Sequence, residues 1–294
     1  MAEGRGRPQI WPMRVLYLEG DGAAGRYLSG TFRKMGVDHH LTLPGESLPQ
    51  SLSGFQAVVI SNFPRLLIQE AEVALAQAVA LAGMGLLMVG GPHAFGRGGY
   101  VDGALAALLP VETRQGDDRR RLSGGAMVEV KRPQHPLLRS LRFGEPLSVM
   151  GFNRLRRRPG TSELLSARAI ARVDTTGVQL AAQGAPLLVV RESVDGVSGR
   201  TAALATSLSP PWSGGLTEWG ERRLSIDAQT EVGEGYAVFV LNLMRWLCGE
   251  EVLFRGEAPS VEAPGELLSD VSPEVRAATP TSERDLSDPP TPIW

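Results

Sequence analysis

Apolar positions in the first hundred residues fall into short uninterrupted runs that alternate with longer segments of helical spacing. The runs are rich in branched and aromatic side chains, as expected for strands buried on both faces, and they cover residues 14–18, 39–43, 57–61 and 86–89. The helical segments cover residues 24–35 and 68–81, and Gly36 and Gly83 follow them as stop signals. Strands that alternate with helices predict right-handed crossovers and a parallel sheet.

The pattern changes after Pro110. Further apolar runs predict strands with few helices between them, at residues 127–130, 163–166, 187–191 and 201–206. The last two flank residues 193–199, a glycine-containing loop of hairpin type. A final helix is predicted by apolar residues at helical spacing, which should bury Phe239 and Trp246, and Gly249 follows its end. We therefore predict an α/β fold with a flavodoxin-like parallel sheet, flanked by helices and extended by antiparallel strands.

The apolar periodicity also predicts where the folded part begins and ends. Residues 1–12 carry no such pattern and are interpreted as a flexible N-terminus, and residues 13–250 form one predicted domain. From residue 258 to the end, seven prolines and seven acidic residues accompany only two arginines. Such a segment cannot bury enough apolar surface to offset the entropy of ordering it. We therefore interpret residues 251–294 as a disordered, acidic, proline-rich tail.

Charge and cysteine content limit the classes of partner and the compartment. Lys and Arg total 30 against 32 Asp and Glu, so a net charge of −2 favours no nucleic acid or anionic membrane partner. Two basic clusters, residues 119–121 and 154–158, are interpreted as a solvated loop and a solvated strand edge, with a phosphate-facing patch as the alternative. The most apolar stretch, residues 71–89, is broken by glycines and predicts no membrane span. A single cysteine and the lack of a secretory signal at residues 1–8 fit a cytoplasmic protein.

The first candidate motif is Gly20-Asp21-Gly22-Ala23-Ala24-Gly25, which follows a predicted strand and opens a helix. It matches the G-x-G-x-x-G loop that cradles a pyrophosphate at a helix N-terminus. A dinucleotide site also needs an acidic residue at the end of the second strand. That strand ends in Leu43-Pro44, and Glu46 lies past the turn. A tight turn that needs small residues is the simpler interpretation, and a dinucleotide-binding domain built on Gly20–Gly25 is the alternative.

The second candidate motif is the glycine-rich run Gly90–Tyr100, directly after the fourth predicted strand. It resembles the signature of the glutamine-amidotransferase-like family, a branch of the class I amidotransferase fold. The resemblance continues in the same order along the chain, in Leu108–Val111, His135–Leu138, Ala205–Thr206, Ser209–Trp212 and Met244–Leu247. It covers residues 14–250 and implies the class I glutamine amidotransferase-like fold.

The same resemblance implies that the catalytic cysteine is missing. Active class I amidotransferases hold a cysteine thiolate in a tight G-x-C-x-G turn, where a helix dipole and a histidine lower the thiol pKa. The resemblance places His93 at that position, and an imidazole cannot form the glutamyl thioester. The His-x-Glu partner motif is absent, because no histidine of the chain has a glutamate two residues later. Cys248 lies near the end of the last predicted helix, where an apolar structural role is expected.

The turn itself stays a candidate site, because backbone N–H groups should converge there and receive an anion or a carbonyl group. Large aromatic side chains elsewhere in the chain are candidates to line a shallow pocket above it, with ordinary packing as the simpler interpretation. The candidate ligand-binding residues are Gly90, Gly91, Pro92, His93, Phe95, Gly96, Gly99, Tyr100, Trp212 and Trp219. We expect no cofactor and no metal, since adjacent His39 and His40 on a strand point to opposite faces.

Three functions follow from these observations. The leading one is a catalytically degenerate amidotransferase-like module that binds a ligand or a protein. The first alternative is a hydrolase or transferase that uses His93 with a nearby carboxylate, and the second is the dinucleotide-binding domain. The tail ends in Ile293-Trp294 after a proline-rich segment, which predicts a peptide that docks on a protein partner or on a second copy of the domain.

Overall fold

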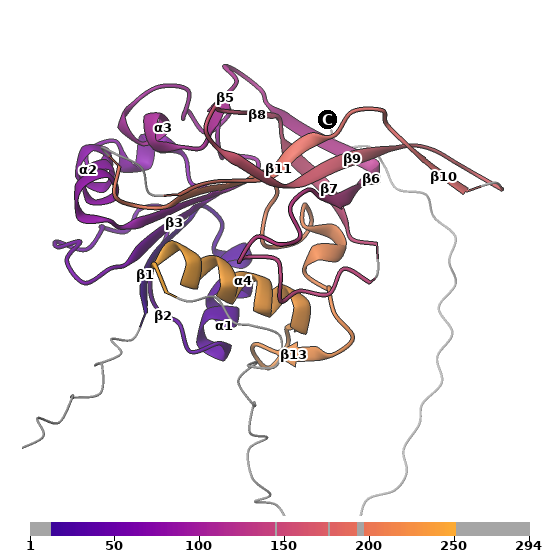
Figure 1. The fold of residues 1–294 in the computed structure, drawn as a ribbon. Coiled ribbons are helices and arrows are strands. Elements are labelled where there is room, and N and C mark those ends of the chain that lie inside the picture. The colour runs from indigo at the N-terminus through magenta and orange to yellow at the C-terminus, as the bar shows by residue number, and fades with distance from the viewer. Residues whose placement is uncertain (1–12, 145, 176, 193–196, 251–294) are drawn as a thin grey trace, which may run out of the picture. The chain divides into compact units, whose positions relative to one another are not determined.

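The computed structural model of the protein describes residues 13–144, 146–175, 177–192 and 197–250 (Figure 1). The predicted flexible N-terminus and acidic tail, with the docking candidates Ile293 and Trp294, lie outside the described residues. Among the described residues, no helix has both the length and the apolar character needed to cross a bilayer.

The core is a ten-stranded mixed sheet in the order β2-β1-β3-β4-β12-β11-β9-β6-β7, with β10 paired to β9 off this path. The first five strands of this order are parallel: β2 (Asp38–Thr42), β1 (Arg14–Glu19), β3 (Ala57–Ser61), β4 (Gly85–Val89) and β12 (Thr201–Leu204). The order of these five strands is the flavodoxin-like order, with β12 in the place of the fifth strand. The predicted flavodoxin-like parallel core is therefore confirmed.

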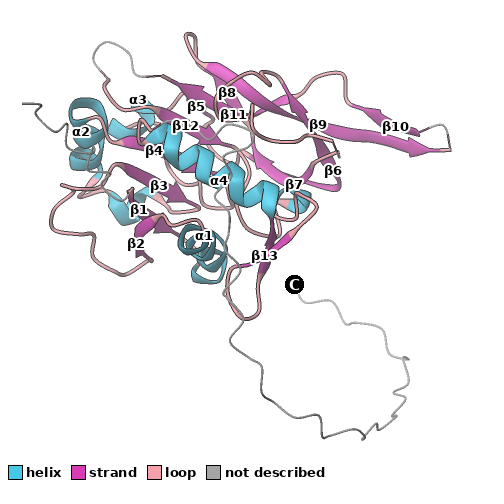
Figure 2. Cartoon of the chain, turned by 60° about the horizontal axis from the view of Figure 1, so that its bottom comes forward, coloured by secondary structure: helices cyan, strands magenta, loops and turns pink. Residues whose placement is uncertain are grey.

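The other half of the sheet is antiparallel, as the sequence predicts. Its strands are β11 (Ala185–Arg191), β9 (Ser162–Asp174), β6 (Arg119–Val130), β7 (Ser148–Asn153) and β10 (Gly177–Leu180). Strand β10 and the end of β9 extend beyond the rest of the sheet (Figure 2). The cluster Arg119–Arg121, interpreted from the sequence as a loop, forms the start of β6, where all three side chains are exposed and both faces of the strand therefore meet water.

Two short strand pairs lie beside the main sheet: β5 (Val111–Thr113) with β8 (Leu155–Arg157), and β13 (Arg223–Ser225) with β14 (Glu231–Gly233). Helices α1 (Gly22–Lys34) and α4 (Glu234–Leu247) lie together on one face of the parallel strands (Figure 1). Helices α2 (Glu72–Ala82) and α3 (Ala104–Leu108) contact each other and lie apart from the first pair. The 3-10 turns are η1 (Arg65–Ile68) and η2 (Gly214–Leu216). Helix α2 therefore begins four residues later than predicted, since Ile68 closes η1.

The packing of α1 and α4 follows from their apolar stripes. Phe239 and Trp246 of α4 are 1% and 2% exposed, which confirms the predicted burial of this helix face. Phe32 of α1 meets Tyr17 of β1 edge to face, with 5.8 Å between ring centroids. Gly83 ends α2 in the left-handed conformation, at φ 78°, as its predicted role as a stop signal requires.

Candidate functional site

The glycine-rich turn Gly90–Tyr100 begins where β4 ends, at the carboxyl edge of the parallel strands. Ligand sites of open α/β sheets lie at this edge. The turn runs close to neighbouring backbone, because a Cβ atom on Gly90 would collide with the carbonyl oxygen of Ala205. Phe95 is buried and adopts φ 46°, a left-handed conformation that is uncommon for an aromatic residue. The glycines are thus required by close approach and by tight turning.

Two asparagines hold the first part of the turn. Asn62 follows β3, and its Oδ1 accepts a hydrogen bond from the backbone N–H of His93 at 2.7 Å. Asn153 ends β7 and is fully buried, and its Oδ1 accepts from the backbone N–H of Gly91 at 3.0 Å. Asn62 has φ 49°, so its hydrogen bond compensates a left-handed conformation that asparagine tolerates. The parallel half and the antiparallel half of the sheet each contribute one of these side chains.

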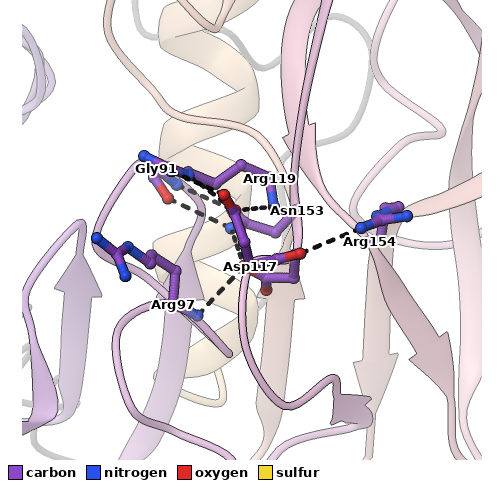
Figure 3. A network of polar contacts seen from close by, with 7 residues as sticks. Gly91, Arg97, Asp117, Arg119, Asn153 and Arg154 are labelled. Atoms are coloured by element: carbon purple, nitrogen blue, oxygen red, sulfur yellow. Dashed lines mark hydrogen bonds and ion pairs between the residues drawn. The ribbon is translucent and has the colours of Figure 1, made fainter.

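A buried carboxylate holds the second part of the turn. Asp118 is fully buried, and its Oδ2 accepts from the backbone N–H of Gly96 at 3.0 Å. Its Oδ1 accepts from the backbone N–H of Arg97 at 3.3 Å and from Nδ2 of Asn153 at 3.2 Å (Figure 3). The N–H groups that the sequence predicts to receive an anion therefore do converge, but on a carboxylate of the same chain.

The neighbouring Asp117 is exposed and anchors the outside of the same loop. Nε and Nη2 of Arg119 each donate to a different carboxylate oxygen of Asp117, both at 2.8 Å. This two-point contact lowers the pKa of Asp117. Arg154 donates from Nη2 to the backbone carbonyl of Asp117 at 3.1 Å, and it extends away from Arg97 in Figure 3. The arginines near the turn therefore fix the loop and do not converge on a common point.

The side chain of His93, which the resemblance places at the position of the catalytic nucleophile, is exposed. Its backbone N–H is bonded to Asn62, whereas its ring makes no hydrogen bond or ion pair to any described residue. A carboxylate within hydrogen-bond reach of this ring would have favoured the alternative of a His93-dependent hydrolase or transferase. The described residues provide none.

The aromatic residues proposed to line a pocket above the turn are buried instead. Tyr100 is fully buried, and its hydroxyl donates to the carbonyl of Phe63 at 2.8 Å. Trp219 is 6% exposed, and its Nε1 donates to the carbonyl of Arg142 at 3.0 Å. Trp212 is 2% exposed and packs against Gly151, where a Cβ atom would lie 2.8 Å from the indole ring. The burial of these rings fits the simpler interpretation, ordinary packing inside the fold.

The Gly20–Gly25 loop has a structural explanation. Asp21 caps α1, and its Oδ1 accepts from the backbone N–H groups of Ala23 at 2.9 Å and Ala24 at 3.3 Å. A pyrophosphate would have to displace this carboxylate from the helix N-terminus. Position 20 requires glycine because a Cβ atom there would collide with the carbonyl oxygen of Asn62. The side chain of Glu46 accepts from the N–H of Leu43 at 2.7 Å, so it stabilises its own loop. These contacts weigh against the dinucleotide interpretation.

Sequence reasoning missed a buried acid at the same edge of the sheet. Glu19 is the last residue of β1 and is 2% exposed. Its Oε2 accepts from the hydroxyl of Tyr17 at 2.6 Å, and its Oε1 accepts from the N–H of Asp21 at 3.0 Å. Burial raises the pKa of Glu19 to about 7, although hydrogen bonds from Tyr17, Ser61 and the Asp21 backbone favour the charged form. The one sequence signal was an acidic residue that ends an apolar run.

Asp118 and Asn153 were also missed, and they matter most for the turn. Asp118 stood within a run of charged residues that is typical of a solvated loop, and Asn153 carried no signal at all. Across the described ranges, no group of three or more His, Cys, Asp or Glu side chains is placed to hold a metal ion.

Comparisons with known proteins identify the family and the fold. A family model described as "Putative glutamine amidotransferase" matches residues 60–227, which is more than half of the 294 residues. The solved structure "Cytoplasmic Protein STM3548 from Salmonella typhimurium" is similar with a TM-score of 0.62 and 21% identity, covering 80% of this chain and 99% of that one. "Cytoplasmic Protein STM1381 from Salmonella typhimurium LT2" is similar with a TM-score of 0.59, the same identity and the same coverage.

At this level of identity, the two solved structures establish the fold alone. A search of curated proteins found no match. The family model covers β4, the glycine-rich turn, Asp118 and Asn153, which are the parts of the chain that build the candidate site. The chain belongs to the family described as putative glutamine amidotransferase, and its turn after β4 carries His93 where the resemblance expects the catalytic cysteine.

Proposed function

We propose that this domain has lost glutamine hydrolysis and acts as a binding module. The observation that carries the proposal is the composition of the turn after β4. His93 stands at the expected nucleophile position, and its ring has no carboxylate partner among the described residues. The backbone N–H groups of Gly91, Gly96 and Arg97, which could stabilise an oxyanion, are bonded to side chains of the same chain.

The lone cysteine does not replace the missing nucleophile. Cys248 caps the end of α4, where the carbonyl of Leu247 lies beside Gly85, the first residue of β4. The glycine-rich turn lies at the other end of this strand, roughly 17 Å away for five residues in extended conformation. Burial raises the pKa of the Cys248 thiol to about 12, so the reactive thiolate is disfavoured at neutral pH.

The accessible part of the turn consists of three exposed residues, two of which carry side chains. His93, Arg97 and Gly99 are exposed, while the residues between them are largely buried. With the backbone donors already bonded, a partner meets the His93 ring and the Arg97 guanidinium first. Such a surface suits a protein partner better than a small anion that needs backbone donors. The solved relatives are titled cytoplasmic proteins, which supports the same compartment for this chain.

Ammonia release from glutamine tests the loss of activity. The full chain should release no ammonia above the rate of glutamine alone, and Cys248→Ser should behave identically. An active class I glutaminase in the same assay shows that the conditions are permissive. Release of ammonia by the wild type that survives Cys248→Ser and disappears in His93→Ala would contradict the proposal.

The binding role is tested by a charge reversal at the turn. In affinity purification from the native host, the wild type should recover a set of partner proteins. The Arg97→Glu variant should not recover this set. Arg33→Glu, which reverses an exposed arginine on α1, is the matched control and should recover the wild-type set. Equal recovery by both variants would place the binding surface elsewhere.

A further inference from the structure

We propose that the turn after β4 is a carboxylate-binding site, which the chain fills with its own Asp118. This carboxylate is fully buried and meets three donors, two from the turn backbone and one from Asn153. Asp118 comes from the segment that precedes β6, and not from the turn itself. The side chain therefore reaches the turn as a ligand would, from a separate part of the chain.

The donors are positioned independently of the carboxylate they bind. The N–H groups of Gly96 and Arg97 belong to a turn that also closes on itself, through bonds from Gly98 N to Ala94 O at 2.9 Å and from Tyr100 N to Phe95 O at 2.9 Å. Asn153 is fixed by its own backbone N–H, which donates to the Ala205 carbonyl at 2.8 Å. Removing the carboxyl group should therefore leave a small cavity lined by oriented donors.

The geometry selects a planar anion with two oxygens. Oδ2 of Asp118 binds Gly96, and Oδ1 is shared by Arg97 and Asn153, so each oxygen has its own donors. Gly96 is required chiefly by the backbone of Arg114, because a Cβ atom there would lie 1.9 Å from the Arg114 carbonyl oxygen, and it would also come within 3.3 Å of Cγ of Asp118. A halide presents one centre and cannot satisfy both sets of donors. The ligand class is therefore a small carboxylate, and formate is the minimal probe.

The test is chemical rescue of Asp118→Ala in the full chain. Formate has the same three heavy atoms as the carboxyl group that this substitution removes. Three donors, two of them in buried hydrogen bonds, lose their acceptor, so the Tm should fall by roughly 5 to 15 °C. Sodium formate should restore a saturable part of this loss, whereas sodium chloride of equal ionic strength and neutral formamide should not. The readout is thermal stability, so the outcome is independent of glutamine hydrolysis and of partner capture.

Two matched variants separate this site from general salt effects. Asp117→Ala removes the neighbouring exposed carboxylate, and formate should not stabilise it more than it stabilises the wild type. Asp118→Asn keeps the cavity filled, so it should lose stability without rescue. If Asp118→Ala is insoluble, expression and lysis in formate should recover folded protein. The proposal is overturned if formate acts equally on all variants, rescues none, or leaves Asp118→Ala insoluble while Asp118→Asn folds.

Discussion

Replacing Glu19 with glutamine should stabilise the fold above about pH 7, and this gain should disappear in acid. Glu19 is 2% exposed at the end of β1, and burial raises its pKa from 4.5 to about 7. Folding therefore favours the protonated carboxyl group. The stability that this preference contributes is fully present below pH 4.5 and is lost as the pH rises to about 7. Glutamine has the shape of the protonated acid and carries no charge at any of these pH values.

The size of the effect follows from the shift in pKa. A shift from 4.5 to about 7 corresponds to roughly 3 kcal/mol of unfolding free energy between the two protonation states. Glu19 is too buried for solvent screening to reduce this figure much. For a chain of this size, 3 kcal/mol corresponds to a change of about 6 to 12 °C in Tm.

Urea unfolding of the wild type and Glu19→Gln measures the difference in unfolding free energy at about pH 5, 6, 7 and 8. The difference should grow in favour of Glu19→Gln across this range and level off above about pH 7. Glu70→Gln, which removes an exposed carboxylate near the start of α2, controls for the loss of one negative charge. A difference that stays constant with pH would refute the assignment of a raised pKa to Glu19.

Two further predictions concern packing. Phe239→Ala should cost about 3–5 kcal/mol of unfolding free energy, because the ring is 1% exposed in the core, and a loss below about 1 kcal/mol in denaturant titrations would contradict this. Gly20→Ala should cost more than about 2 kcal/mol, since its Cβ atom collides with the Asn62 carbonyl oxygen. Gly22→Ala should be tolerated, because its Cβ atom meets nothing closer than 3.5 Å, and equal losses from the two alanines would exclude the steric explanation.

The parallel half of the sheet is predictable because its inner strands β1, β3, β4 and β12 are buried on both faces, whereas only the edge strand β2 is partly exposed. Burial on both faces produces an uninterrupted apolar run, and β3 occupies residues 57–61 in the structure as in the sequence pattern. The antiparallel half is harder. Strand β6 begins with Arg119–Arg121, whose exposed side chains are indistinguishable from those of a loop until the pairing with β7 is known. Its predicted extent, residues 127–130, covers only the end of the strand.

The candidate site shows the same limit. The glycine-rich turn is visible in the sequence because close approach of backbone requires glycine at Gly90 and Gly96. The side chains that fill the turn come from 22 residues away for Asp118 and from 62 residues away for Asn153. No local periodicity encodes such distant pairs. The sequence therefore indicates that the turn has donors to offer, and only the fold reveals that they are already occupied.

The position of β12 has a consequence for how the protein is made. This strand joins the two halves of the sheet, between β4 and β11, yet it is the last strand of that sheet to leave the ribosome. Val89 of β4 is synthesised more than a hundred residues before Leu204, its pairing partner in β12. Until then β4 presents an open strand edge, a feature that favours aggregation. Co-translational folding of the parallel half alone is thus incomplete, and cutting the gene between the halves leaves neither fragment with a closed core.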